Sequence, residues 1–106
     1  MKTSALTGAA LDWAVAKCEQ LEVRFISKVL YIYGGDKYNP STNWAQGGAL
    51  IERERISLIG ESGESWIAEW GWIKMVGDTP LIAAMRAYVA SKFGSEIDVP
   101  EELTDE

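Results

Sequence analysis

The sequence predicts a small α+β domain in which two main helices pack on a small antiparallel sheet of about three strands, with short helical turns in the central loop. Three observations lead to this fold class. Apolar residues recur at helical spacing near both ends of the chain. Residues 23–33 and 65–73 are rich in β-branched and aromatic side chains, which favour strands. The length of 106 residues, with 47% apolar side chains, fits one domain with one hydrophobic core.

The first helix is predicted at about residues 8–20. Thr7 is a favourable N-cap residue, and Leu6 before it can pack on Leu11 as a hydrophobic staple. The spacing of the apolar side chains then gives one buried stripe along the helix. This stripe consists of Leu11, Ala14, Cys18 and Leu21.

Residues 23–33 are predicted to form one strand. The run reads VRFISKVLYIY, and its second half is apolar on both faces. That pattern suits a central strand that is covered at one end. Gly34 and Gly35 follow and end the strand.

The central segment is predicted as a loop with short helical turns. Ser41 or Thr42 can cap a single helical turn over residues 43–46, which Gly47 would end. For residues 49–55 two interpretations remain open, a second short helix and an irregular turn.

Residues 56–59 and 65–73 are predicted to pair as an antiparallel hairpin. The second segment reads SWIAEWGWI, and its side chains alternate between two faces. One face would hold Trp66, Ala68, Trp70 and Trp72, and the other Ile67, Glu69, Gly71 and Ile73.

The last helix has the clearest boundaries. Thr79 is a good N-cap residue, Pro80 suits the first helical position, and Gly94 suits the position after the helix end. The buried stripe is predicted to contain Leu81, Met85, Tyr88, Val89 and Phe93.

The acidic character of the chain is local. Six of the 16 acidic residues lie in residues 96–106, which contain no Lys or Arg, so the first 95 residues hold ten acids and ten bases. We therefore predict a neutral globular domain over residues 1–95 and an acidic, flexible tail over residues 96–106. The tail is interpreted as a solubilising end, with a role in contacting a basic partner as the alternative.

Several classes of protein are disfavoured by the composition. A neutral body without a basic stripe argues against nucleic-acid binding, which depends on Lys and Arg. No run approaches the roughly 20 apolar residues of a membrane span, and the start of the chain lacks the apolar core of a signal peptide. The single cysteine, Cys18, cannot form an internal disulfide. The sequence thus predicts a cytoplasmic protein of a bacterial-type cell.

Catalytic and metal chemistry find little support in the residue types present. The chain has no histidine, which removes imidazole bases and most zinc sites, and no cofactor or metal is predicted. Cys18 lies on an apolar stripe and is interpreted as an inert packing residue. Asp12 is attributed to the field at a helix N-terminus. A carboxylate-dependent enzyme would have to use residues such as Glu52, Glu54 or Glu69. The charged run 52–55, which contains the first two, is better interpreted as a solvated face with local ion pairs.

One loop combines the groups that bind a polar planar ligand. Aromatic faces offer stacking area, and amide and hydroxyl groups offer directional hydrogen bonds. The alternative is that the indole of this loop fills the core while its polar groups cap helices. The candidate ligand-binding residues are Tyr38, Asn39, Ser41, Thr42, Asn43, Trp44, Gln46, Gly47 and Gly48.

The indoles of the second hairpin form a candidate partner interface. Five tryptophans are more than so small a core ordinarily encloses. Trp66, Trp70 and Trp72 are therefore predicted either to face the core or to form an aromatic patch for a partner protein. A homodimer that buries the excess indoles is an intermediate possibility.

Three blocks of the chain resemble the NinX family of small bacteriophage and prophage proteins. They read TGAALDWAVAKCEQL, YNPSTNWAQGGALIERERISL and GDTPLIAAMRAYVASKFG, and together they span nearly the whole chain in order. The resemblance implies a phage or prophage origin. It implies no reaction, and no catalytic residues follow from it.

These observations together predict a non-catalytic binding module that acts in a bacterial host cell. The partner is expected to be a host protein or, second, a small polar ligand, and sequestration that counters a host defence would fit either. The first alternative is a structural or regulatory role through self-association. A small carboxylate-dependent enzyme is the third hypothesis.

Overall fold

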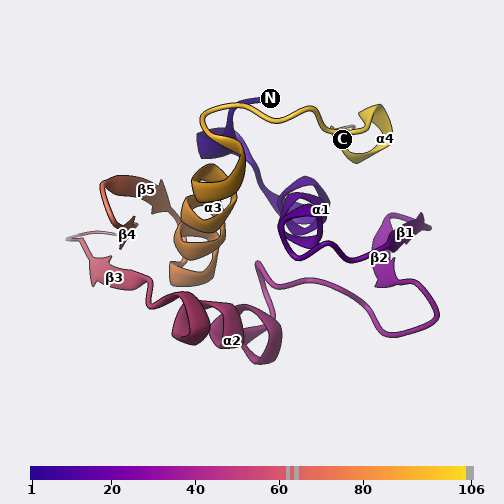
Figure 1. Ribbon diagram of the computed structural model, residues 1–106, viewed down its shortest axis with the longest axis horizontal. Helices are drawn as coiled ribbons and strands as arrows, with labels where there is room; N and C mark the ends of the chain where they lie inside the picture. The colour runs from indigo at the N-terminus through magenta and orange to yellow at the C-terminus, as the bar shows by residue number, and fades with distance from the viewer. Residues whose placement is uncertain (62, 64, 105–106) are drawn as a thin grey trace.

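Helix α3 (Pro80–Phe93) lies at the centre of the molecule, and the other elements are arranged around it (Figure 1). The computed structural model describes residues 1–61, 63 and 65–104. On one side of α3 lies a sheet of three antiparallel strands, β3 (Ser57–Gly60), β4 (Trp66–Trp70) and β5 (Ile73–Gly77). The α+β class that the sequence predicts is confirmed.

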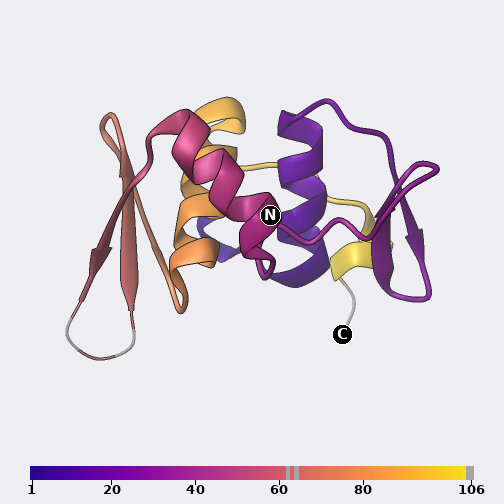
Figure 2. The same cartoon turned by 90° about the horizontal axis from the view of Figure 1, so that it is seen from below.

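The opposite side of α3 is covered by the other two long helices, α1 (Gly8–Cys18) and α2 (Trp44–Glu54). Beyond α1 lies a second sheet that the sequence did not predict, made of β1 (Val23–Ile26) and β2 (Val29–Ile32). Seen from below, the layers follow in the order three-stranded sheet, α3, α1 and two-stranded sheet, with α2 crossing between them (Figure 2).

Both ends of α3 agree with the predicted boundaries. The Thr79 hydroxyl accepts the Ile82 N–H at 3.1 Å, Pro80 is the first helical residue, and Gly94 follows with φ of 81°. Most of the helix is buried, and its alanines let β5 approach closely. A Cβ added to Gly77 would lie 2.5 Å from the backbone nitrogen of Ala83, so the contact between β5 and α3 requires glycine there.

Helix α1 begins where the sequence predicts and ends two residues earlier. Thr7 is in the N-cap position, although its side chain makes no capping hydrogen bond within the described residues. At the other end Gln20 has φ of 60° and the Leu21 N–H donates to the Ala16 carbonyl, which closes the helix.

The prediction of one strand over residues 23–33 was wrong. Val23–Ile26 pairs antiparallel with Val29–Ile32, so that Ile26 is opposite Val29. Ser27 and Lys28 form the two-residue turn between them with φ of 52° and 67°. A turn with two positive φ values is normally marked by Asn or Gly, and the absence of those residues hid the hairpin.

The single helical turn predicted over residues 43–46 is the first part of a longer helix. Helix α2 continues through Gly47 and Gly48 to Glu54 and ends at Arg55, which has φ of 57°. The open question about residues 49–55 is thus answered by a helix. Gly47 lies inside the helix because the close packing against Pro40 leaves no room for a side chain. A Cβ at this position would lie 2.3 Å from the Pro40 carbonyl oxygen.

The predicted hairpin between the third and fourth strands is confirmed, with Leu58 opposite Ala68. The alternation of the following segment, however, ends at Trp70. Gly71, with φ of 63°, and Trp72 form a turn, and Trp70 is opposite Ile73 on β5. Trp72 consequently lies in the turn and not on the sheet face shared by Trp66 and Trp70.

The segment predicted as an acidic tail is packed on the body over its described part. Thr3 donates its N–H to Ser95, Ile97 donates to Met1, and the side chains of Ile97 and Leu103 are buried. The short helices η1 (Thr3–Ala5) and α4 (Glu101–Thr104) belong to this region. The folded body therefore extends past residue 95, and residues 105–106 lie outside the described residues.

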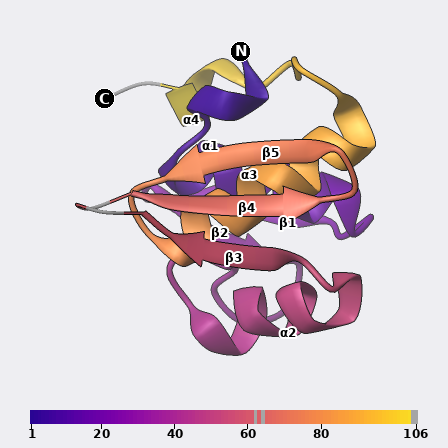
Figure 3. The same ribbon diagram turned by 90° about the vertical axis from the view of Figure 1, so that its left-hand side faces the viewer.

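Helix α3 covers only one face of the three-stranded sheet. In the described part of the chain no element lies over the other face, which is turned toward the viewer in Figure 3. The cross-strand partners Ile59, Ile67 and Val76 form an apolar row on that face. Within the described residues no helix is long and apolar enough to cross a membrane.

Candidate functional site

The segment predicted to bind a ligand consists of two structurally different parts. Its first part is a loop, and its second part begins helix α2 at Trp44. Asn43 is the N-cap residue, in place of the Ser41 or Thr42 that the sequence suggested, and its side-chain oxygen accepts the N–H groups of Ala45 and Gln46. The amide of Asn43 is therefore used to start the helix.

Gln46 fastens the loop to the first turn of α2. Its side-chain oxygen accepts the Asn39 N–H at 2.7 Å, and its side-chain nitrogen donates to the Lys37 carbonyl at 2.8 Å. Both halves of the amide are thereby engaged by the backbone. This side chain holds the loop in place and has little capacity left for a ligand.

Trp44 does not fill the core, because 56% of its surface is exposed. It is the first residue of α2, and a Cβ added to Gly48 would lie 3.3 Å from its ring. Gly47 is buried against Pro40 and Leu81. These three residues of the predicted site thus do not gather around one ligand position.

The remaining four residues of the predicted site line a cleft of about 220 Å³. The cleft lies between the loop, the start of α1 and the turn of the β1–β2 hairpin. Tyr38, Asn39, Ser41 and Thr42 form the side contributed by the loop. The other lining residues are Gly8, Ala9, Asp12, Lys28, Val29, Leu30 and Lys37.

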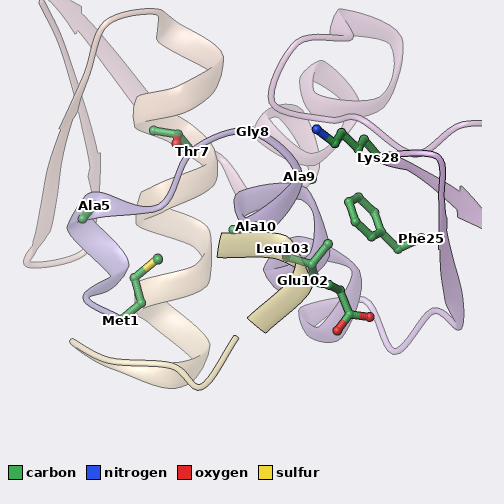
Figure 4. Close-up of a pocket in the computed structure, with 10 residues that line it drawn as sticks. All are labelled: Met1, Ala5, Thr7, Gly8, Ala9, Ala10, Phe25, Lys28, Glu102 and Leu103. Carbon is green, nitrogen blue, oxygen red and sulfur yellow. The ribbon is translucent and has the colours of Figure 1, made fainter. Parts of the chain in front are cut away.

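A second cavity of about 490 Å³ adjoins this cleft and shares Gly8, Ala9 and Lys28 with it. Figure 4 shows the Lys28 side chain reaching toward the start of α1, with Phe25 and Leu103 farther into the cavity. The cleft combines its polar groups with the apolar side chains of Val29 and Leu30, and the adjoining cavity adds Phe25 and Leu103 together with Glu102.

Asp12 is the buried charged group of the cleft, with only 5% of its surface exposed. One carboxylate oxygen accepts the Ser41 N–H at 2.8 Å, which ties the loop to α1. Burial raises the pKa of Asp12 to about 6, and the hydrogen bonds from Ser41 only partly offset this effect. Within the described residues no Lys or Arg forms an ion pair with it.

The interpretation of Asp12 from the sequence was incomplete. Asp12 is the fifth residue of α1, beyond the first turn where the helix dipole acts most strongly. The sequence did contain one indication that Asp12 is buried, because this carboxylate lies between Leu11 and Ala14, which belong to the buried stripe of the helix. Lys28 and Lys37 gave no comparable indication, because only the fold brings them to the cleft.

A second polar network, partly exposed, lies at the end of α1. Arg53 donates to both oxygens of Glu19, at 2.9 and 2.6 Å, and the Tyr88 hydroxyl forms a short hydrogen bond with the same carboxylate. Arg53 also pairs with Glu54 at 2.7 Å. The charged run 52–55, interpreted as a solvated face, thus supplies a cross-link between α1, α2 and α3.

The glutamates of the enzyme hypothesis lie outside the cleft. Glu54 is paired with Arg53, Glu69 lies 3.7 Å from Lys74, and Glu52 is exposed. Among the described residues no group of three or more His, Cys, Asp and Glu side chains could hold a metal ion. Cys18 is half-buried, and burial raises the pKa of its thiol to about 12, so the thiol is neutral at physiological pH.

The three indoles of the candidate partner interface are divided by the β4–β5 turn. Trp66 and Trp70 are half-buried and pack against the core. Trp72 is 97% exposed, and a hollow of about 310 Å³ lies beside it, lined by Trp70, Ile73 and Ser91. The prediction that some indole surface lies outside the core therefore applies to Trp44 and Trp72.

Comparison with known proteins identifies one family. A family model described as Bacteriophage P22, NinX matches residues 2–92. The match includes α1, both sheets and every residue that lines the cleft beside Asp12. A search among curated proteins finds no match to the chain.

Proposed function

Starting from the fact that this chain belongs to the NinX family of bacteriophage proteins, we propose that it is a non-catalytic binding protein. In this proposal a small polar ligand occupies the cleft at the start of α1. The observation that supports it is the buried carboxylate of Asp12, which lines the cleft without a basic partner in the described residues.

A buried and unpaired carboxylate is costly for a protein to keep. Charged groups are seldom fully buried unless they are paired, because the interior does not solvate them as water does. Such groups, when they line a cleft and have a displaced pKa, are candidates for functional sites. Asp12 meets both conditions.

The cleft also has the dimensions and the polar groups that a small ligand requires. The Ser41 hydroxyl is bonded to the carboxylate, and the exposed hydroxyl of Thr42, which donates to the Asn39 carbonyl, can accept a hydrogen bond from a ligand. Ligand sites combine a few such polar groups with an otherwise apolar wall. Ala9, Val29 and Leu30 supply that wall in the cleft itself.

The test is an NMR screen of the isotopically labelled full chain against a library of small polar compounds. Binding should shift the backbone amides of Gly8, Ala9, Ser41 and Thr42 before others. An Ala9→Phe substitution should fill the cleft and abolish the shifts. The matched control, Ala49→Phe on the exposed surface of α2, should leave them intact. Binding that persists in the Ala9→Phe variant would contradict the proposal.

A protein partner is the second candidate function, and the exposure of Trp72 favours it. Tryptophan is enriched among the residues that contribute most to protein interfaces, and Trp72 projects from a turn beside an apolar hollow. This candidate predicts that Trp72→Ala prevents capture of a host protein, whereas Ala9→Phe does not. Equal capture by the wild type and the Trp72→Ala variant would argue against it.

A further inference from the structure

The cleft is lined by a buried acid, Asp12, and by two exposed lysines, Lys28 and Lys37, and these charges indicate the chemistry of the ligand. Resting on the function proposed above, we propose that the ligand is a small zwitterion. Its cationic N–H group binds the carboxylate of Asp12, and its anionic group binds the ammonium groups of Lys28 and Lys37.

The Asp12 carboxylate has unused capacity to accept hydrogen bonds. An ionised carboxylate has about four acceptor positions, and within the described residues the bonds that reach Asp12 come from the backbone N–H and the side chain of Ser41. A ligand ammonium would add charge-assisted bonds and would compensate for the water that burial removes. A cationic group is therefore the natural partner for this position.

The two lysines place positive charge on the same cleft. Lys28 comes from the β1–β2 turn and Lys37 from the start of the loop, and both side chains are exposed. Neither forms an ion pair within the described residues. Because the two segments converge on one cleft from different parts of the fold, an anionic group there would meet both ammonium groups.

This separation of charge discriminates between classes of ligand. A simple anion would be attracted by the lysines and repelled by Asp12, and a simple cation would experience the reverse. A molecule with both charges can place its cationic group at Asp12 and its anionic group at the lysines, so its charges are complementary to those of the cleft. The cleft volume of about 220 Å³ corresponds to roughly seven water molecules in the liquid, so the ligand would have the size of an amino acid.

Two sources of this chemistry are amino acids and aminoalkyl phosphates, which differ in the anionic group. The probes are therefore β-alanine and phosphoethanolamine, compared at pH 7.5 with propylamine, propionate and propionamide as the cationic, anionic and neutral analogues. Titrations followed by NMR of the full chain report both the affinity and the position of binding. At least one zwitterion should bind at least tenfold more tightly than the three analogues.

Three variants test the assigned contacts. Asp12→Asn keeps an oxygen that can accept the Ser41 N–H and removes the charge, so zwitterion affinity should fall at least tenfold while circular dichroism is unchanged. Lys28→Gln should also weaken binding severalfold and should not disturb the core. The matched control is Lys74→Gln, which removes an exposed lysine from the three-stranded sheet and should have no effect.

The outcomes separate the ligand class from the function itself. If neutral or singly charged compounds bind in the cleft as tightly as the zwitterions, or if Asp12→Asn binds normally, the zwitterion assignment is wrong while the proposed function stands. If no compound of any charge class shifts the amides of Gly8 and Ser41, the proposed function fails together with the assignment.

Discussion

Asp12 on α1 and Glu19, the residue that follows the end of that helix, have opposite surroundings. They are seven residues apart, which is close to two helical turns, so both carboxylates leave the chain on nearly the same side. Glu19 accepts two bonds from Arg53 and one from Tyr88. Asp12 accepts the backbone N–H of Ser41 and has no basic partner in the described residues.

The pKa values of the two carboxyls move in opposite directions for this reason. The hydrogen bonds from Arg53 lower the pKa of Glu19, against a smaller opposing effect of burial. Burial raises the pKa of Asp12 to about 6. Ionisation of Glu19 therefore stabilises the fold, whereas ionisation of Asp12 costs stability. A residue that lowers stability at neutral pH is typical of a functional position, and this contrast separates the cleft from the scaffold.

The largest effect is expected from Glu19→Gln. Removing the charge weakens the bonds that Arg53 and Tyr88 make to this side chain, and the free energy of unfolding at pH 7 should fall by about 2 to 3 kcal/mol, less than for a fully enclosed pair because Arg53 is half-exposed. Since the native pKa of Glu19 lies below its unfolded value, the stabilisation is present above pH 4.5 and is lost as the pH falls through the native pKa. Urea unfolding at several pH values measures this.

The control for this prediction is Glu22→Gln, which alters an exposed acid just beyond the same helix. Its stability should match that of the wild type within about 0.5 kcal/mol. Equal losses from the two substitutions would show that the network around Arg53 is not a special source of stability.

The next effect is expected from Gly47→Ala, which acts on the Asp12 side of the comparison. The added methyl group would meet the Pro40 carbonyl oxygen at 2.3 Å, so the loop that bonds Asp12 must move. We expect a loss of about 2 kcal/mol, measured by thermal unfolding. Gly48→Ala is the matched control, because the nearest atom to its new methyl belongs to the exposed Trp44 ring, and it should be neutral or stabilising by up to about 1 kcal/mol.

Asp12→Asn should have a smaller effect of opposite sign. The native pKa of about 6 exceeds the unfolded value of 3.8, so the protonated carboxyl contributes stability below pH 4 that is lost as the pH rises through 6. The neutral variant should therefore be more stable than the wild type by about 1 to 2 kcal/mol at pH 7.5. The two proteins should converge near pH 4 in urea unfolding. A variant less stable at pH 7.5 would mean that the ionised carboxylate holds the loop in place.

The smallest effect is expected from Ser41→Ala. The Ser41 side chain helps to lower the pKa of Asp12, so its removal should raise that pKa slightly further. The backbone bond to Asp12 remains, and stability should change by less than about 1 kcal/mol. Carbon-detected NMR of the carboxyl groups measures the titration midpoint, and Thr42→Ala at the exposed neighbouring position serves as the control. A midpoint that falls in the Ser41→Ala variant would be incompatible with this role.

Local sequence patterns were sufficient for the two long helices at the ends of the chain. Thr79, Pro80 and Gly94 determine the ends of α3 by local chemistry, and the structure agrees. The start of α1 after Thr7 was predicted for the same reason. The ends of these helices depend on residues that are neighbours in the chain, so they can be predicted from a single sequence.

Features that depend on distant contacts were missed. Gly47 and Gly48 ordinarily end a helix, but α2 continues through them because Pro40 and Leu81 pack where a side chain would lie. Ser27 and Lys28 make a hairpin turn without the usual turn residues. In both cases the local preference is overridden by packing elsewhere in the fold.

The candidate site was predicted in part. Tyr38, Asn39, Ser41 and Thr42 line a cleft, although binding there stays a prediction. The opposing residues, Asp12 and Lys28, come from a helix and a turn that only the tertiary structure brings to the loop. The position of a charged residue on the apolar face of α1 was a sequence feature that pointed to Asp12, and nothing comparable pointed to Lys28.

The central claim is that the Asp12 carboxylate is buried without a cationic partner and is thus available to a ligand. Its titration in the free protein, followed by NMR of the side-chain carboxyl carbon, tests this claim most directly. The account predicts a midpoint of about 6 for Asp12 and a midpoint below 4.5 for Glu19. A midpoint for Asp12 at or below 3.8 would show that this carboxyl is already solvated or paired, and would contradict the account.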